Sequence, residues 1–271
     1  MAIERVAVVG AGVMGAGIAA HCANAGLQVL LLDIVPEGAK DRDVIAKTAI
    51  QRMLKADPAP FMTKRAAERV RPGNVEDHLE QLAACDWIVE AVVEKAEIKR
   101  ALYEKIERVR KDGSIVSSNT STLRLRTLVE DLPERFRRDF LITHFFNPPR
   151  YMRLLEIVAG PETRVDAVAE VAELADRRLG KTVIRCHDRP GFIANRLGAF
   201  WIQAAIRHAR ERGLTVEEAD AVMGRPFGFP KTGVFGLLDL VGLDLVPHVD
   251  ASLRASLSAS DPTMACAPSS R

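Results

Sequence analysis

The sequence predicts an α/β protein in which a mostly parallel sheet with an inserted helical hairpin precedes a smaller all-helical domain. Short apolar runs alternate with helical patterns through the first part of the chain, as strands and crossover helices do in parallel sheets. A glycine-rich turn joins the first such run to the first helix. Beyond Pro190 only helical patterns follow, so we place the two domains at residues 1–188 and 189–271.

The first elements make one β-α-β unit. Residues 5–9 are a β-branched apolar run, residues 12–25 have helical spacing, and residues 29–32 form a second apolar run. Two polar, basic helical patterns at residues 37–55 and 62–70 then predict the hairpin, because the D-P-A-P sequence between them interrupts a helix.

The sheet resumes after the hairpin and the chain ends in helices. We expect strands at residues 86–93, 114–118, 140–145, 154–158 and 181–185, and helices at 96–110, 163–178 and 192–212. Thr215 and Glu218 have the spacing of a capping box at the start of the next helix.

Composition excludes several classes of protein. With 38 basic and 36 acidic residues, the net charge of +2 gives no field that favours nucleic acid. No run of 18 apolar residues and no signal-peptide pattern occurs, so we expect a cytoplasmic protein without a membrane span. The four cysteines lie far apart without metal-ligand spacing, which predicts neither a metal site nor a disulfide framework.

The turn G-A-G-V-M-G at residues 10–15 has the G-x-G-x-x-G spacing of a dinucleotide-binding fingerprint. Gly10 allows the tight turn, Gly12 lets the backbone approach a pyrophosphate, and Gly15 lets helix and strand pack closely. The spacing alone is a weak signal, but here a strand precedes it, a helix follows it, and Asp33 ends the next strand. We therefore predict a Rossmann-type domain that binds a pyrophosphate at the helix N-terminus.

Asp33 selects the nucleotide. Its carboxylate can accept hydrogen bonds from both ribose hydroxyls and would repel a 2′-phosphate, and no arginine follows it directly, so NAD is favoured over NADP. Glu94 and Lys99 are weaker candidates because they follow the strand at residues 86–93, where ligands gather in such sheets. From the residues alone, the preferred interpretation of Lys99 is a solvated helix lysine.

His144 and Glu156 form the second candidate group. Glu156 lies in an apolar run where an unpaired carboxylate is costly, and His144 lies near the end of the preceding strand, so the two side chains can meet. A neutral imidazole can take the proton of an alcohol during oxidation, while a carboxylate on its other nitrogen fixes the tautomer. A solvent-facing carboxylate at residue 156 is an equally acceptable alternative at this point.

Four motifs together resemble those of the L-3-hydroxyacyl-CoA dehydrogenases of fatty-acid β-oxidation. They are G-A-G-V-M-G, S-N-T-S, H-F-F-N-P and P-G-F-I-A-N-R-L, which occur in this order. The likeness extends from about Arg5 to Asp250 and implies NAD-dependent oxidation of (S)-3-hydroxyacyl-CoA to 3-oxoacyl-CoA. The residues from His144 to Glu156 are most similar to long bacterial multifunctional proteins, in which an enoyl-CoA hydratase domain follows the dehydrogenase.

The resemblance also implies roles for individual residues. It makes His144 the catalytic base and Glu156 its partner, and it assigns Ser121 and Asn195 to the substrate. It assigns NAD contacts to the glycines and to Met14, Asp33, Glu94, Lys99 and Asn147. The hairpin helps to hold CoA in this family, which makes its basic residues candidates for the CoA phosphates: Lys47, Arg52, Lys55, Lys64 and Arg65.

The same resemblance implies a helical domain that forms a homodimer and usually continues well beyond residue 250. Here a polar tail without helical periodicity begins near Ser258, and we expect it to be disordered. Missing helices would expose apolar side chains of Phe200, Trp201, Ile206 and residues 234–245. Two alternatives therefore stay open, namely an impaired NAD-binding remnant and a related dehydrogenase of a free 3-hydroxy acid.

Overall fold

The computed structural model describes residues 3–228, 231–243, 257, 258, 260 and 261, which divide into two compact units. The first unit comprises residues 1–188 and the second residues 189–271, and each is described separately. The prediction of a disordered tail falls mainly on residues outside those described. In the described part of the chain, no helix combines the length and apolar character that crossing a membrane requires.

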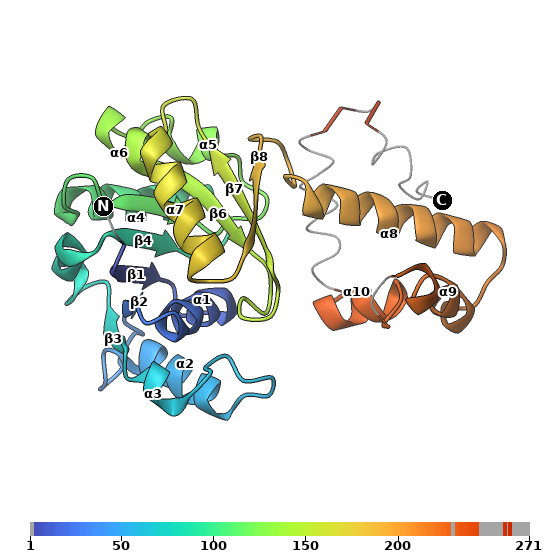
Figure 1. The fold of residues 1–271 in the computed structure, drawn as a ribbon, viewed down its shortest axis with the longest axis horizontal. Coiled ribbons are helices and arrows are strands. Elements are labelled where there is room, and N and C mark those ends of the chain that lie inside the picture. Colours follow the sequence, from blue (N-terminus) through green and yellow to red (C-terminus); the bar gives the residue numbers. More distant parts are fainter. Residues whose placement is uncertain (1–2, 229–230, 244–256, 259, 262–271) are drawn as a thin grey trace. The chain divides into compact units, whose positions relative to one another are not determined.

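An eight-stranded sheet forms the centre of the first unit (Figure 1). Its order across the sheet is β3 (Val70–Asn74), β2 (Gln28–Asp33), β1 (Arg5–Val9), β4 (Trp87–Glu90), β5 (Ile115–Ser118), β6 (Phe140–Phe145), β7 (Leu154–Ala159) and β8 (Thr182–Cys186). All described neighbours are parallel except β6 and β7, which are antiparallel. The strand order reverses between β1 and β4, and ligands bind at such a switch point beyond the carboxyl ends of the strands.

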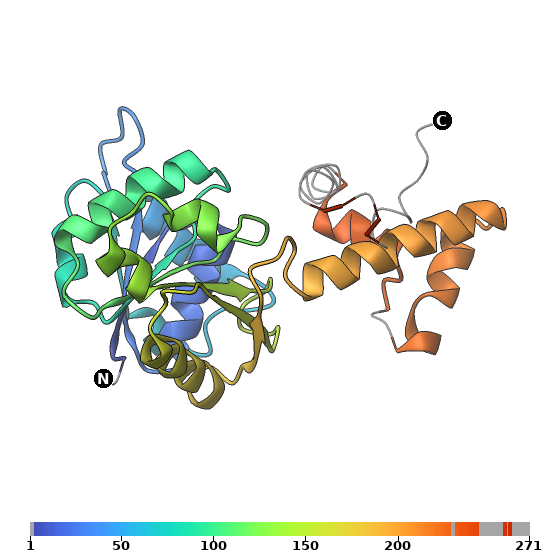
Figure 2. The same ribbon diagram turned by 90° about the horizontal axis from the view of Figure 1, so that it is seen from above.

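Helices cover both faces of this sheet (Figure 2). On one face, α1 (Val13–Asn24), α2 (Val44–Lys55), α3 (Lys64–Ala67) and α7 (Val165–Arg177) bury a continuous apolar core. On the other face lie α4 (Ala96–Val109), α5 (Leu125–Val129), α6 (Glu134–Asp139) and the 3-10 helix η1 (Leu79–Ala84). Three aromatic rings pack together there: the centroid of the Tyr103 ring lies 5.4 Å from that of Phe136 and 5.2 Å from that of Phe140.

The inserted hairpin differs from the prediction. Its first helix begins at Val44 instead of Glu37, and its second helix shrinks to the four residues of α3. The segment after it is the edge strand β3, which the sequence did not suggest because Pro72 and Gly73 disfavour strands. At an edge this composition is tolerated, because only β2 needs the hydrogen bonds of β3. The short helices α5 and α6 were also missed.

The second unit contains the helices α8 (Ala194–Glu211), α9 (Val216–Val222) and α10 (Phe235–Val241), with the 3-10 turn η2 (Arg225–Phe227). The predicted capping box is confirmed, since Thr215 accepts from Glu218 N and the Glu218 carboxylate accepts from Thr215 N.

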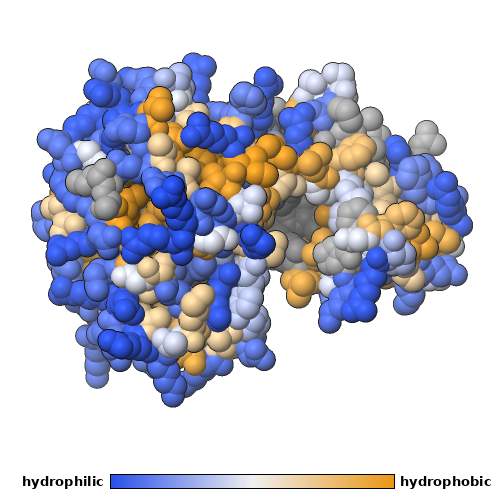
Figure 3. Space-filling model, viewed as in Figure 1, coloured by the Kyte–Doolittle hydropathy of each residue, from blue (hydrophilic) through white to orange (hydrophobic). Residues whose placement is uncertain are grey.

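The expected exposure of apolar side chains in this unit is correct only in part. Phe200 is 39% exposed and Leu240 75%, whereas Val234 is fully buried and Leu238 almost so. Their burial reflects packing of α10 against α9. Figure 3 shows hydrophilic residues over much of the visible surface, with apolar residues gathered in smaller patches.

Candidate active site

The glycine turn after β1 is built on two close backbone contacts. Gly10 has a φ of 105°, and a Cβ there would lie 2.4 Å from the Ala91 carbonyl oxygen at the end of β4. A Cβ on Gly15 would lie 1.8 Å from the Gly10 carbonyl oxygen. Gly12 instead borders open space, and no side chain caps the N-terminus of α1. The N–H groups of this first turn have no side-chain cap and therefore suit the pyrophosphate of a dinucleotide.

Asp33 lies at the carboxyl end of β2, beside this turn. Its carboxylate accepts hydrogen bonds from Ala11 N at 2.5 Å and Ile34 N at 2.7 Å. These two hydrogen bonds hold the turn and the carboxylate in one arrangement. Met14, also expected at the cofactor, lies in the first turn of α1 and packs partly against the core.

Lys99 is not the solvated lysine that the residues alone favoured. Only 1% of it is exposed, and its ammonium group lies 2.7 Å from Glu90 and 3.2 Å from Glu94. A signal for burial was present, because Tyr103 and Ile106 share its helix face at the i+4 and i+7 positions. Lys99 therefore acts within the protein by holding two carboxylates in place.

Glu90, which the sequence analysis did not single out, is the fully buried centre of this network. Its carboxylate accepts from Lys99, from Val92 N at 2.7 Å, and from the hydroxyls of Tyr103 and Ser118 at 2.6 Å each. Burial and the Glu90 charge raise the pKa of Tyr103 well above its usual value, so its hydroxyl stays protonated and donates. Glu90 ties the ends of β4 and β5 to α4.

Replacing Lys99 with methionine is expected to destabilise the protein by about 3–5 kcal/mol, because it leaves the buried Glu90 carboxylate without its cation. Urea denaturation measures this loss. Arg126→Met is the control, since its pair with Glu130 is exposed and contributes at most about 1 kcal/mol. Equal stability of the two variants would contradict the structural role of Lys99.

Glu94 joins the loop after β4 to the loop after β5. One of its oxygens accepts from the Thr120 hydroxyl at 2.5 Å and from the backbone N–H groups of Ser121 and Thr122 at 3.1 and 3.2 Å. Burial pushes the pKa of Glu94 upward, but the Lys99 charge and these hydrogen bonds outweigh it and hold the pKa below its usual value. The ionised carboxylate therefore fixes Ser121, a predicted substrate contact, through its backbone.

His144 and Glu156 lie directly opposite each other in the antiparallel β6–β7 pair. His144 Nδ1 is 2.8 Å from Glu156 Oε2. Glu156 is fully buried, so the alternative of a solvent-facing carboxylate is wrong, and His144 is 5% exposed. The Phe146 ring contacts the imidazole at 4.3 Å between centroids. A carboxylate in this position makes Nδ1 the protonated nitrogen and leaves proton transfer to Nε2.

Asn119 was also missed, although it stands within S-N-T-S. Its side-chain oxygen accepts from Phe145 N at 3.0 Å, and its own N–H donates to the Glu90 carbonyl oxygen at 2.8 Å. It therefore links the end of β6, immediately after His144, to the ends of β4 and β5. Asn147, predicted near the nicotinamide, lies exposed in the β6–β7 loop.

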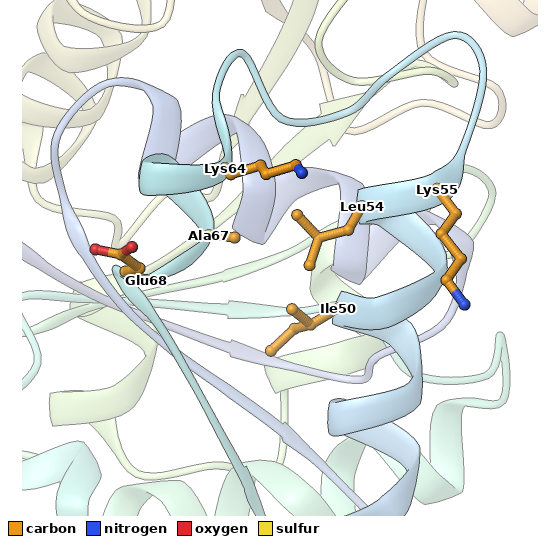
Figure 4. A pocket seen from close by; sticks show the side chains of 6 residues that line it. All are labelled: Ile50, Leu54, Lys55, Lys64, Ala67 and Glu68. Carbon is orange, nitrogen blue, oxygen red and sulfur yellow. The ribbon is translucent and has the colours of Figure 1, made fainter.

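The basic hairpin residues predicted to contact CoA lie in different surroundings. Lys47 pairs with Asp41 at 2.7 Å, so its charge already has a partner within the protein. Lys55 and Lys64 instead border an open pocket between α2 and α3, whose floor includes Ile50 and Leu54 (Figure 4). Arg52 borders a second cavity of about 250 Å³, together with Gly12 and Asn147. Arg65 is exposed on α3.

Asn195 lies in the first turn of α8, in the second unit, so its position relative to His144 is not described. Among the described residues, no group of three or more His, Cys, Asp or Glu side chains is arranged to hold a metal ion. Within the first unit, the glycine turn, Asp33, the Glu90–Lys99–Glu94 network and His144 lie at or just beyond the carboxyl ends of β1, β2, β4 and β6. Glu156 lies near the amino end of β7, which is antiparallel to β6 and therefore begins at the same edge of the sheet. Such an edge can place a dinucleotide beside an acid–base pair.

Two family profiles cover nearly the whole chain. Residues 5–189 match the profile described as 3-hydroxyacyl-CoA dehydrogenase, NAD binding domain, and residues 191–268 match the C-terminal domain of the same family.

Relatives and solved structures agree with these profiles. A probable 3-hydroxyacyl-CoA dehydrogenase of Deinococcus radiodurans is 45% identical over 92% of this chain and 72% of its own length. A putative fatty acid oxidation complex trifunctional enzyme of Rickettsia felis is 42% identical over 96% of this chain, but this chain spans only 36% of its length. The crystal structure of FadB2 from M. tuberculosis superposes with a TM-score of 0.82 at 31% identity, covering 100% of this chain and 92% of that one.

Proposed function

Because this chain belongs to the 3-hydroxyacyl-CoA dehydrogenase family, we propose that it oxidises (S)-3-hydroxyacyl-CoA to 3-oxoacyl-CoA with NAD. The observation that supports this most is the buried His144–Glu156 pair, at the same edge of the sheet as the glycine turn. NAD, when bound, supplies the hydride acceptor. The residues around the turn fit it, because Gly12 leaves open space and the start of α1 has no side-chain cap.

His144 acts as the general base in this proposal. Its Nδ1–H donates to Glu156, which fixes the tautomer that presents the Nε2 lone pair to the 3-hydroxyl of the substrate. As the hydroxyl proton moves to Nε2, the Glu156 carboxylate stabilises the imidazolium that forms. Ser121 and Asn195 are proposed to orient the substrate oxygen, and Asn147 and Glu94 to border the nicotinamide side of the site.

The thioester is proposed to reach the site over the hairpin. Lys55 and Lys64 border the pocket between α2 and α3, together with the apolar side chains of Ile50 and Leu54 (Figure 4). The Glu68 carboxylate borders the opposite end of the same pocket, so the CoA phosphates are proposed to lie toward the two lysines. A surface of this kind suits the nucleotide end of CoA, whose phosphates are anionic and whose base is flat and aromatic. This assignment rests on charge and shape.

The activity is tested by mixing the purified chain with NADH and acetoacetyl-CoA and following the loss of NADH absorbance. We expect turnover with the thioester and little with free acetoacetate, because the free acid lacks the part that Lys55 and Lys64 would contact. Equal rates with both substrates would favour a dehydrogenase of free 3-hydroxy acids. NADH binding without turnover would identify an NAD-binding protein that lacks the proposed activity.

Cellular context and assembly are proposed only in outline. Relatives named as fatty acid oxidation complex trifunctional enzymes suggest that the reaction serves alongside other steps of fatty acid oxidation. We also propose a homodimer formed by the helical unit, where Leu197 is 63% exposed and Leu240 75%.

A further inference from the structure

The loop between β6 and β7 occupies residues 146–153, directly after His144 and before Glu156. It carries Asn147, and its inner turn is closed by hydrogen bonds from Tyr151 N and Met152 N to the Pro148 carbonyl oxygen at 3.0 Å each. The position of this loop therefore decides where Asn147 stands relative to His144.

Lys181 lies beneath this loop. It precedes β8, is 3% exposed, and its ammonium group donates to the carbonyl oxygens of Pro149 and, at 2.7 Å, Met152. The same nitrogen lies 5.8 Å from the centroid of the Phe145 ring, within cation–π range. One side chain thus contacts both ends of the inner turn and the residue that follows His144.

The surroundings of Lys181 bury its ammonium group and lower its pKa. The titratable side chains that interact with it from α1 are Cys22 and His21. Burial raises the pKa of Cys22 to about 12 and lowers the pKa of His21 to about 4, so both are neutral at pH 7. Burial also lowers the pKa of Lys181 to about 8, which leaves it mostly protonated at pH 7. Burying an ammonium group that has carbonyl oxygens as partners and no carboxylate costs stability. The hydrogen bonds to Pro149 and Met152 offset part of that cost.

Other contacts hold the same loop from its remaining sides. Arg150 donates to the carbonyl oxygens of Ala59 and Phe61, and the Tyr151 hydroxyl donates to Ala59. On α1, a Cβ on Gly17 would lie 2.9 Å from Pro149, so the loop rests directly on the helix whose N-terminus faces the proposed pyrophosphate. The loop is therefore placed relative to α1, and Lys181 supplies its inner anchor.

We propose that Lys181 is a positioning residue: its ammonium group holds the inner turn of the β6–β7 loop, which packs on α1 through Pro149, and so sets Asn147 and His144 against the nucleotide. The catalytic meaning of this anchor rests on the proposed dehydrogenase function. The anchoring itself does not, and it can be measured without turnover.

Hydrogen exchange of the loop amides tests the anchoring. Lys181→Met keeps the length and apolar stem of the side chain but removes the donors, so we expect peptides covering residues 148–153 to exchange about tenfold faster. Arg178→Met is the control, because Arg178 also donates to two carbonyl oxygens, those of Ile3 and Ala25, in addition to its pair with Glu4. These contacts lie near the amino end of β1, away from the β6–β7 loop. Arg178→Met should leave the loop unchanged. If Lys181→Met does not purify folded, Lys181→Gln replaces it, since the shorter amide cannot reach both oxygens.

Kinetics test the consequence. We expect kcat of Lys181→Met to fall about tenfold to a hundredfold, the scale of a small misplacement of reacting groups. The Kd for NADH should rise much less, because the glycine turn and Asp33 keep their contacts. The deuterium isotope effect on hydride transfer should rise, because misalignment slows that step. A lysine with a purely structural role would lower the melting temperature without this split between kcat and NADH affinity.

The outcomes separate the two proposals. Unchanged loop exchange in Lys181→Met overturns the anchoring, whatever the activity. Faster exchange with unchanged kcat, measured where the variant is fully folded, overturns the link from anchor to catalysis. Absence of turnover in the wild type overturns the proposed function, and the exchange result then decides the anchoring alone.

Discussion

Replacing His144 with alanine is expected to lower kcat/KM with acetoacetyl-CoA by about 10³-fold, since general acid–base catalysis by a positioned side chain is typically worth 10²–10⁴-fold. NADH affinity should change little, because the glycine turn and Asp33 lie on other strands. Glu156→Gln should show a smaller loss, because an amide can still accept from Nδ1–H but carries no charge to stabilise the imidazolium. Initial rates of NADH oxidation, with NADH titrated separately by fluorescence, measure both effects.

A matched control comes from a second His–Glu pair in the chain. His208 Nδ1 lies 3.0 Å from Glu211 on the exposed side of α8, where the histidine side chain is 51% exposed. His208→Ala therefore removes a similar pair from a solvated surface and should retain wild-type rates. If His144→Ala lost less than about tenfold in activity, the loss would be well below the usual contribution of a general base, and another group would have to be the base.

Gly15→Ala is expected to abolish measurable NADH binding and to destabilise the first unit. The new Cβ would lie 1.8 Å from the Gly10 carbonyl oxygen, so the turn must open. Overpacking typically costs about 1–3 kcal/mol, and a shift of about 1 Å in the turn can cost a hundredfold in function. NADH titration by fluorescence and thermal unfolding measure the two losses.

Gly12→Ala separates the two effects. Its Cβ meets nothing within 4 Å, and its φ of −65° is acceptable for alanine, so the melting temperature should not change. NADH affinity should still fall, because the methyl group occupies the space proposed for the pyrophosphate. Wild-type NADH affinity in Gly12→Ala would place the nucleotide elsewhere.

The parts of the fold that followed from sequence are those fixed by local constraint. The β1–turn–α1–β2 unit could be predicted because Gly10 and Gly15 allow no side chain there, and Asp33 closes the unit within one short segment. His144 and Glu156 could be paired because only a hairpin separates them. Each of these inferences needed only neighbouring residues.

The missed features depend on how different elements pack on one another, which spacing along the chain does not show. Glu90 ends an apolar run, as Glu156 interrupts one, but its partners Lys99, Tyr103 and Ser118 come from α4 and β5. The strand β3 becomes a strand because β2 offers it a free edge, against the preferences of Pro72 and Gly73. Lys99 and Lys181 both contradict the usual exposure of lysine, and their tertiary contacts show what each buried ammonium group binds.

The antiparallel β6–β7 register, which sets His144 opposite Glu156, also limits how these two strands can vary in length. Side chains alternate between the two faces of a sheet, so one residue inserted within β6 or β7 would turn one partner to the opposite face. An insertion of two residues would restore the face but move the partners out of register. The buried His144–Glu156 pair thus makes the spacing of these strands intolerant of insertions and deletions.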